Sequence, residues 1–278
     1  MITIDRTKLI RGISFSLYFV IIFVAFLVLL FPFDRIKFRL ESEIRERTPL
    51  ELHIARISPR FINRFALSDV VLSDRTGRVL FESPVVNAHV SVFNLLRGIV
   101  SVDLRTKAYG GEVAVRSEQG AKRKFLSLDA NGLDLASYAL LKNLGVKLSG
   151  RLGGTYEMSG DVGTAKVLLK NLASRELVIR GFPVPDLDFE QVWIEGDVRG
   201  DRFLIKKFEL DGKELKVRLS GDLVMRELGT LNLAVKLKPS ERLAREQAGL
   251  LSLLKNRDAE GFYQFSLGGT VSEPLPRL

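Results

Sequence analysis

The chain has 278 residues, with 42 lysines and arginines against 33 acidic residues, a net charge of +9, and no cysteine. The lack of cysteine excludes disulfides, thiolate zinc sites, cysteine nucleophiles and cysteine-ligated iron–sulfur clusters. Because His53 and His89 are the two histidines of the sequence, a multi-histidine metal site is close to excluded as well. A hydrophobic content of 46% and a charged content of 27% are typical of a globular chain and exclude a disordered one.

An apolar run near the N-terminus accounts for much of the positive mean hydropathy of +0.11. No charged residue occurs from Gly12 to Phe33. At about 1.5 Å per residue, a helix over this run spans roughly 30 Å, the thickness of a bilayer's hydrocarbon core. The run ends in Leu-Phe-Pro-Phe, whereas a cleaved signal peptide ends in small residues. We therefore expect an uncleaved transmembrane helix over 12–33, preceded by a cytoplasmic N-terminus over 1–11.

The orientation of this span is less clear from the charges on its two sides. Three basic residues precede it, and five more follow between Arg35 and Arg47, interleaved with acidic residues. The positive-inside rule therefore gives no decision by itself. Because a long C-terminal domain translocates largely regardless of its charge, we expect the N-terminus inside and the remaining chain outside the cytoplasm.

A short helix is expected directly after the span. Ile36, Leu40 and Ile44 recur at helical spacing, and Pro49 ends the pattern. We predict a membrane-proximal helix over 34–48 that packs on the domain following it. A helix lying on the membrane surface is the alternative.

Residues 49–278 show the period-two alternation of β-strands. The clearest apolar positions are Leu215, Val217 and Leu219 in one run and Leu231, Leu233 and Val235 in another. Such strands have one apolar and one wet face, and short turns such as Gly110-Gly111 join them antiparallel. Glycines inside the runs, including Gly150 and Gly221, predict bends that let a broad sheet curl. We therefore expect one mainly β domain over 49–278, built on a curved, largely antiparallel sheet.

Two later segments have helical patterns. Asp134 to Asn143 begins with an Asp cap, and Ser240 to Asn256 begins with a Ser cap and has an apolar stripe. With the helix after the span, the sequence therefore predicts two or three accessory helices. The amphipathic segment from Ser240 is expected to cover an open face or end of the sheet.

No motif in the sequence carries recognisable chemistry. The glycines between Gly150 and Gly154 lack the Lys-Ser/Thr ending of a phosphate loop. His53 and His89 lie in alternating runs and are expected to face solvent, and Asp186 and Asp188 have no third ligand at EF-hand spacing. We therefore predict a non-enzymatic protein with no catalytic residues, no metal site and no cofactor.

The basic excess does not indicate a nucleic-acid-binding protein. Lysines and arginines are spread along the whole chain, and six of the phenylalanines lie in the apolar run, so no stripe of basic and aromatic residues is evident. Anionic lipid head groups or a protein partner are better targets for the basic positions of the clearest strands. These positions are Lys216, Arg218, Lys236 and Lys238. We expect most of this charge to be the solvated face of a sheet.

Two further motifs follow the single span and the helix. They are Val90–Gly98 (VSVFNLLRG) and Ala108–Val113 (AYGGEV). With this order of elements and motifs, the chain resembles the type II secretion system protein N family (GspN) and, more distantly, the AsmA/TamB group. Gly132–Leu135 (GLDL) and Phe265–Pro274 carry the resemblance to the end of the chain. The resemblance implies a single-pass protein of the bacterial inner membrane, with a periplasmic, groove-like β-sheet and no catalytic residues. For the AsmA group it also implies lipid handling.

Two functions remain as hypotheses. The first is an accessory, non-enzymatic component of the type II secretion system that contacts secretion-machinery proteins in the periplasm. The second is an AsmA-like module whose apolar groove binds or transfers phospholipid. The six apolar positions Leu215, Val217, Leu219, Leu231, Leu233 and Val235 would line that groove, or would lie in a packed core, which we favour from the sequence.

Overall fold

The computed structural model describes residues 33–277, except 62, 122, 139–140, 142–146, 177, 180–181, 184–185, 225–228, 255–256 and 271–272. The predicted cytoplasmic segment and all but the last residue of the predicted span lie outside this range. Among the residues that are described, no helix is both long and apolar enough to cross a bilayer.

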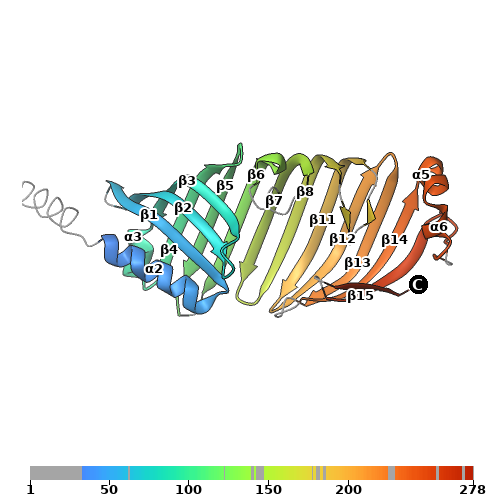
Figure 1. Ribbon diagram of the computed structural model, residues 1–278. Helices are drawn as coiled ribbons and strands as arrows, with labels where there is room; N and C mark the ends of the chain where they lie inside the picture. The colour runs from blue at the N-terminus through green and yellow to red at the C-terminus, as the bar shows by residue number, and fades with distance from the viewer. Residues whose placement is uncertain are drawn as a thin grey trace, which may run out of the picture.

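One sheet of 14 strands dominates the described part of the chain (Figure 1). Its first eight strands are β1 (Leu50–Phe61), β2 (Arg64–Asp74), β3 (Val79–Val90), β4 (Val100–Ala108), β5 (Gly111–Gln119), β6 (Lys124–Asp134), β7 (Lys147–Ser159) and β8 (Val162–Arg175). The other six are β11 (Leu187–Arg199), β12 (Arg202–Gly212), β13 (Leu215–Val224), β14 (Thr230–Pro239), β15 (Tyr263–Gly269) and β16 (Pro274–Arg277). Neighbouring strands follow chain order and pair antiparallel, which confirms the predicted mainly β, antiparallel fold.

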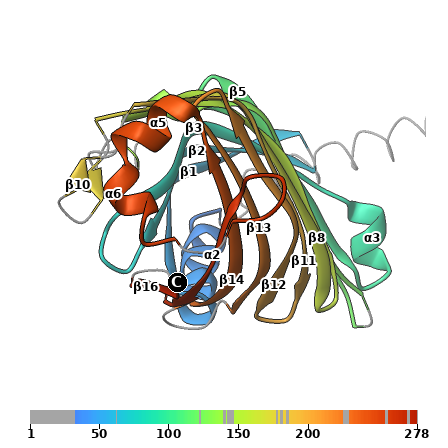
Figure 2. The same ribbon diagram turned by 90° about the vertical axis from the view of Figure 1, so that its right-hand side faces the viewer.

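Small elements decorate this sheet. They are the helices α2 (Phe33–Arg47), α3 (Val92–Leu96), α5 (Glu241–Glu246) and α6 (Ala248–Leu251), the 3-10 turn η1 (Leu135–Ser137) and the hairpin β9 (Val178–Ile179)–β10 (Phe182–Pro183). Helix α2 packs on β1, α3 on β4 and α5 on β14. Viewed end-on in Figure 2, the sheet forms an arch. The strands therefore build a curved trough, and the short helices lie at its ends and rims.

Glycines and two irregular backbone positions bend the strands. Gly150 and Gly221 have φ values of 144° and 131°, and a Cβ at Gly221 would lie 2.2 Å from the carbonyl oxygen of Asn232. A register shift occurs next to Gly150, as expected for a glycine within a strand. Asp69 in β2 and Asn171 in β8 also have positive φ values, 49° and 51°. These positions reverse the side-chain alternation locally and curve the sheet.

Both edges of the sheet are protected against pairing with another chain. At the first edge, α2 lies along β1, and the Glu41 carboxylate accepts a hydrogen bond from the Ile54 backbone N–H at 2.9 Å. At the last edge, β16 contains Pro274 and Pro276, which have no N–H to donate. A covering helix and edge prolines are two recognised ways of blocking edge-to-edge association.

The predicted helix from Asp134 to Asn143 is wrong at its start, whereas Leu141 is helical and residues 139–140 and 142–146 lie outside the described residues. Asp134 does cap a turn, but that turn is the single 3-10 turn η1, and Tyr138 is already extended at φ −73° and ψ 114°. The Tyr138 hydroxyl donates a hydrogen bond to the Leu80 carbonyl, and its ring packs edge-on against Tyr109 at 5.2 Å. These contacts with distant strands hold Tyr138 in an extended conformation.

The predicted helix from Ser240 is present but interrupted. The Ser240 hydroxyl accepts a hydrogen bond from the Leu243 backbone N–H at 3.2 Å, as expected for an N-cap. Gln247 leaves the helical region at φ −110° and ψ 24°, and α6 starts after it. The segment therefore forms two short helices at the end of the sheet.

Candidate functional site

The six apolar positions singled out from the sequence share one face of the sheet. The first three lie on β13 and the second three on β14, and the register pairs Leu219 with Val235 and Leu223 with Leu231. Leu233 and Val235 are 8% and 7% exposed, whereas the other four side chains are half-buried. The structure therefore brings all six together.

The apolar face continues across the whole sheet. Residues paired between neighbouring strands point to the same side, so the register can be followed from one strand to the next. One such row consists of Ile57, Leu67, Val86, Thr106, Val113, Ala130, Gly154, Val167, Ile194, Phe208, Leu219, Val235 and Phe265. Thr106 is its one polar side chain. The row crosses every strand of the 14-stranded sheet from β1 to β15.

From β7 to β15, the rows on both sides of this central row are also mainly apolar. On one side lie Leu152, Leu169, Val192, Leu210, Val217, Leu237 and Tyr263, and on the other Tyr156, Ala165, Gly196, Ile205, Gly221, Leu233 and Leu267. With strands about 4.8 Å apart, the central row is roughly 58 Å long. Successive residues of one face are about 6.8 Å apart along a strand, so three rows make an apolar strip roughly 14 Å wide.

This strip lines the inside of the arch and is not sealed by a second layer in the described part of the chain. Helix α2 reaches the end of the strip near β1 and β2, where the Phe33 and Phe65 rings are 6.0 Å apart. Val192 and Val198 are only 3% and 4% exposed, because curvature brings side chains on the inner face together. Ile54 is nevertheless the one described large side chain with less than 2% exposure. Because the strands pair in chain order, β1 and β16 lie at opposite edges and the described sheet stays open. The packed core that the sequence favours for the six positions stays a prediction.

The opposite face of the sheet is charged and wet. Asp103 and Arg116 face each other across β4 and β5 with 2.6 Å between carboxylate and guanidinium, and Lys166 lies 3.6 Å from Glu195 across β8 and β11. Such exposed pairs contribute about 0–1 kcal/mol each, so they do little for stability. These charged pairs instead determine which face of the sheet is hydrated, because they keep this face toward water and the apolar strip on the inner side.

The two histidines lie among polar partners on exposed surfaces. The His53 side chain is 68% exposed, with Nδ1 3.8 Å from Glu41. His89 Nε2 is 2.9 Å from the Asn63 amide nitrogen, and His89 Nδ1 is 3.6 Å from Asp103. Partial burial opposes ionisation of Asp103, but the hydrogen bond and charge of Arg116, aided by His89, lower its pKa below the ordinary value.

No catalytic or metal-binding constellation emerges from the described residues. Three or more metal-ligating side chains do not meet anywhere among them. Asp186 and Asp188, the acidic pair noted in the sequence, both contact Arg175. Gly150, Gly153 and Gly154 lie within strand β7, as expected. The apolar strip is therefore the most distinctive surface that the structure offers.

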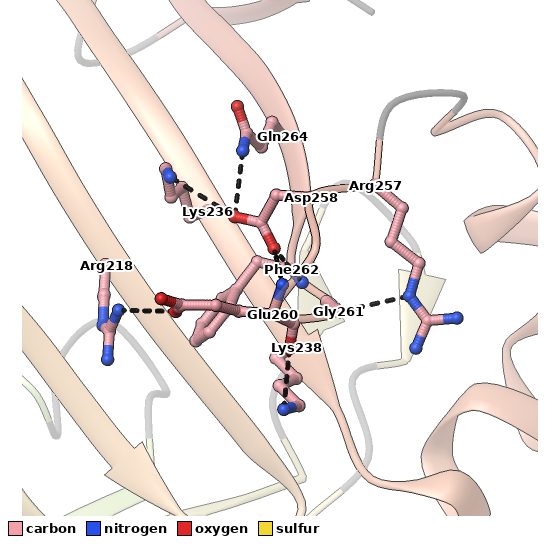
Figure 3. Close-up of polar contacts among 9 residues, drawn as sticks. All are labelled: Arg218, Lys236, Lys238, Arg257, Asp258, Glu260, Gly261, Phe262 and Gln264. Carbon is pink, nitrogen blue, oxygen red and sulfur yellow. Dashed lines mark hydrogen bonds and ion pairs between the residues drawn. The ribbon is translucent and has the colours of Figure 1, made fainter.

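The basic positions considered for anionic ligands are largely engaged within the chain (Figure 3). Lys236 contacts Asp258 at 3.3 Å, and Arg218 contacts Glu260 at 3.4 Å. Lys238 donates to the Glu260 carbonyl at 2.9 Å. The loop between α6 and β15 thus folds over the charged face of β13 and β14, and these cations hold the loop.

Asp258 organises this loop. Its carboxylate accepts hydrogen bonds from the backbone N–H groups of Phe262 and Glu260, at 2.8 and 3.1 Å, and from the Gln264 amide at 3.0 Å. The Phe262 N–H makes the largest contribution to lowering the Asp258 pKa, and Lys236 adds to it. Phe262 is 4% exposed and packs its ring beneath the Arg218 guanidinium at 4.8 Å.

Most of the strip was not predicted from the sequence. Val113 and Val115 alternate cleanly and could have been assigned to it. In β8, however, Leu169 and Leu172 both pack in the same inner cluster although they are three positions apart, because Asn171 has a positive φ. A search for strict alternation cannot detect such strands, and their faces are fixed by register with their neighbours.

No protein-family model, no curated protein and no solved structure matches the chain. The assignment to the GspN family, the inner-membrane location and the secretion partners therefore stay predictions. The geometry of the sheet alone supports a functional proposal.

Proposed function

We propose that this protein binds lipid acyl chains along the inner apolar face of its sheet. The observation that carries the proposal is the row of apolar side chains that follows the register from Ile57 to Phe265 without a covering layer among the described elements. Membrane phospholipid is the expected ligand class, and no cofactor or catalytic step is needed.

The physical basis is the removal of two apolar surfaces from water. Each buried methylene of an acyl chain contributes about 0.8 kcal/mol, so even part of one chain in the trough gives appreciable affinity. The inner strip has few polar groups to fix an orientation, whereas the open side of the arch would leave a polar head group in water. Such a site selects for long, flexible apolar chains and tolerates different head groups.

The accessory role in type II secretion remains the alternative proposal for this chain. The wet outer face would make the protein contacts that it requires, but no particular contact surface among the described residues favours a secretion subunit. An inner-membrane anchor with the sheet in the periplasm is compatible with both functions. The open apolar face gives lipid binding the stronger support.

Adjacent residues of β13 provide a matched test of lipid binding. Leu219 lies on the apolar strip, and Ser220 is exposed on the opposite face. Leu219→Asn places an amide in the strip, which we expect to lower phospholipid affinity about tenfold, whereas Ser220→Asn leaves it unchanged. Phospholipid bound per full-length chain is measured by mass spectrometry after extensive detergent exchange.

The two variants share the same N-terminal segment, so lipid held there cancels in the comparison. Circular dichroism and the thermal midpoint confirm that both variants are folded. Equal phospholipid content in wild type, Leu219→Asn and Ser220→Asn would refute binding in the trough.

A further inference from the structure

The end of the sheet near α2 carries an exposed cluster of large apolar side chains. We define the N-terminal apolar tip as Phe61, Val92, Phe93, Leu95 and Leu96. Leu96 is 83% exposed, Phe61 67% and Phe93 62%. Exposed apolar residues are common singly, but a group of five at one end of a molecule indicates a surface that meets an apolar partner.

Two connections bring these side chains together. The Ser91 hydroxyl caps α3, which joins β3 to β4, and the Ser91 N–H donates to the Ser101 carbonyl at 3.0 Å. The Val90 N–H donates to the Asn63 carbonyl at 2.9 Å, which ties the start of α3 to the turn between β1 and β2. Phe61 precedes that turn. The tip is thus held by the backbone of two neighbouring connections.

Cations surround the tip. The Arg97 guanidinium lies over the Phe93 ring at 4.2 Å, and Arg60 and Arg64 are exposed on either side of the β1–β2 turn. A hollow of about 710 Å³ opens beside Phe61. It is lined by Arg60, Phe61, Arg64, Phe65, Asn87, Ala88, His89, Asp103 and Arg105. Three arginines against one aspartate make this hollow suited to an anionic head group.

The position of the tip agrees with the predicted membrane span. The apolar run over 12–33 ends at Phe33, and the Phe33 ring contacts Phe65, next to Arg64 on the β1–β2 hairpin. The chain therefore enters the sheet at the end that carries the tip. A bilayer crossed by the preceding residues would lie nearest to this end.

We propose that the N-terminal apolar tip inserts into the surface of an anionic bilayer, with Arg60, Arg64 and Arg97 at the level of the lipid phosphates. Aromatic and leucine side chains in the acyl boundary, with arginines reaching the head groups, are the usual composition of an interfacial membrane contact. The contact seats one end of the trough on the membrane. It does not depend on lipid occupying the trough.

The absence of native cysteine allows a clean test with single labels. Leu95→Cys places an environment-sensitive fluorophore at the tip, and Leu253→Cys places it at the opposite end of the sheet. The native side chains are 52% and 56% exposed, so the two positions are matched. The full chain is reconstituted in phosphatidylethanolamine–phosphatidylglycerol vesicles, with and without brominated acyl chains.

We expect bromolipid to quench the label at position 95 several-fold more than the label at 253. Combining Leu95→Cys with Phe93→Ser and Leu96→Ser should abolish that difference without changing the circular dichroism spectrum. Replacing phosphatidylglycerol with phosphatidylcholine should weaken the quenching.

Equal, weak quenching at both positions in the native background would overturn the proposal. Shielding of position 95 that appears only after membrane proteins are added would also overturn it, in favour of a protein partner. Neither result depends on the phospholipid content of the Leu219→Asn variant, so the tip and the trough are tested separately.

Discussion

The two ends of the sheet treat similar apolar side chains in opposite ways. At the C-terminal end, Leu251, Leu254 and Phe262 are 8%, 9% and 4% exposed, although Leu253 and Leu275 are 56% and 58% exposed. At the N-terminal end, Phe93 and Leu96 are 62% and 83% exposed. The C-terminal end therefore buries a cluster of its large apolar side chains, whereas the five residues of the N-terminal apolar tip are all exposed.

The connections between strands explain the difference. Between β14 and β15 the chain forms α5, α6 and a loop that folds back over Lys236 and Arg218, anchored by Asp258. Between β3 and β4 it forms only the five-residue helix α3, and the described chain does not return over it. The chain thus covers part of the C-terminal end itself, whereas the described chain leaves the N-terminal apolar tip exposed.

The largest expected contrast between the ends comes from replacing one phenylalanine at each. Phe262→Ala removes a buried ring and its packing beneath Arg218, and should lower the free energy of unfolding by about 3 kcal/mol. Phe93→Ala removes an exposed ring and should change it by less than about 0.5 kcal/mol. Denaturant unfolding of the full chain in detergent measures both, and similar losses would contradict the comparison.

A smaller effect is expected from releasing the C-terminal loop. Asp258→Asn weakens the acceptor for two backbone N–H groups and removes the charge facing Lys236. Hydrogen-exchange protection around Phe262 should fall by roughly tenfold. Glu260→Gln is the matched control, because the Glu260 side chain is 70% exposed and should matter little. Unchanged protection in Asp258→Asn would show that the Asp258 carboxylate is not needed to hold the loop.

The same loop should resist acid. A carboxyl whose pKa is lowered on folding contributes stability that is fully present above its unfolded pKa, near 4, and is lost as the pH falls through the lower folded value. The loop contacts should therefore persist at pH 5 and disappear only below about pH 4. Hydrogen-exchange protection of the loop is measured across this pH range in wild type, with Asp258→Asn as the pH-insensitive reference. A loss of protection as the pH falls in wild type alone is the expected result.

Local patterns in the sequence predicted several elements correctly. The alternation around Leu219 and Val235 predicted two strands and placed their apolar residues on one face, and Ser240 was correctly identified as a helix cap. Gly150 was expected to mark a bend and lies at a register shift. These features depend on nearest neighbours in the chain, which is why they can be read from the sequence.

Features that depend on distant contacts could not be predicted. Tyr138 leaves the helical pattern because its hydroxyl bonds Leu80, 58 positions away. Asp258 reaches Lys236 across 22 positions, through a loop with no recognisable motif. The continuity of the apolar row from one end of the sheet to the other depends on the register of every strand pair, and bulges such as that at Asn171 hide it from a search for alternation.

The most direct test of the central claim is photo-crosslinking from within the trough. Strand β13 is ten strand spacings, roughly 48 Å, from β1, so lipid around the predicted span cannot reach it. A photoreactive benzoylphenylalanine replaces Leu219 in one full-length variant and Ser220 in another, each in phospholipid vesicles. Lipid binding in the trough predicts a phospholipid adduct at position 219 and none at position 220. Equal labelling at both positions, or no adduct at 219, would contradict it.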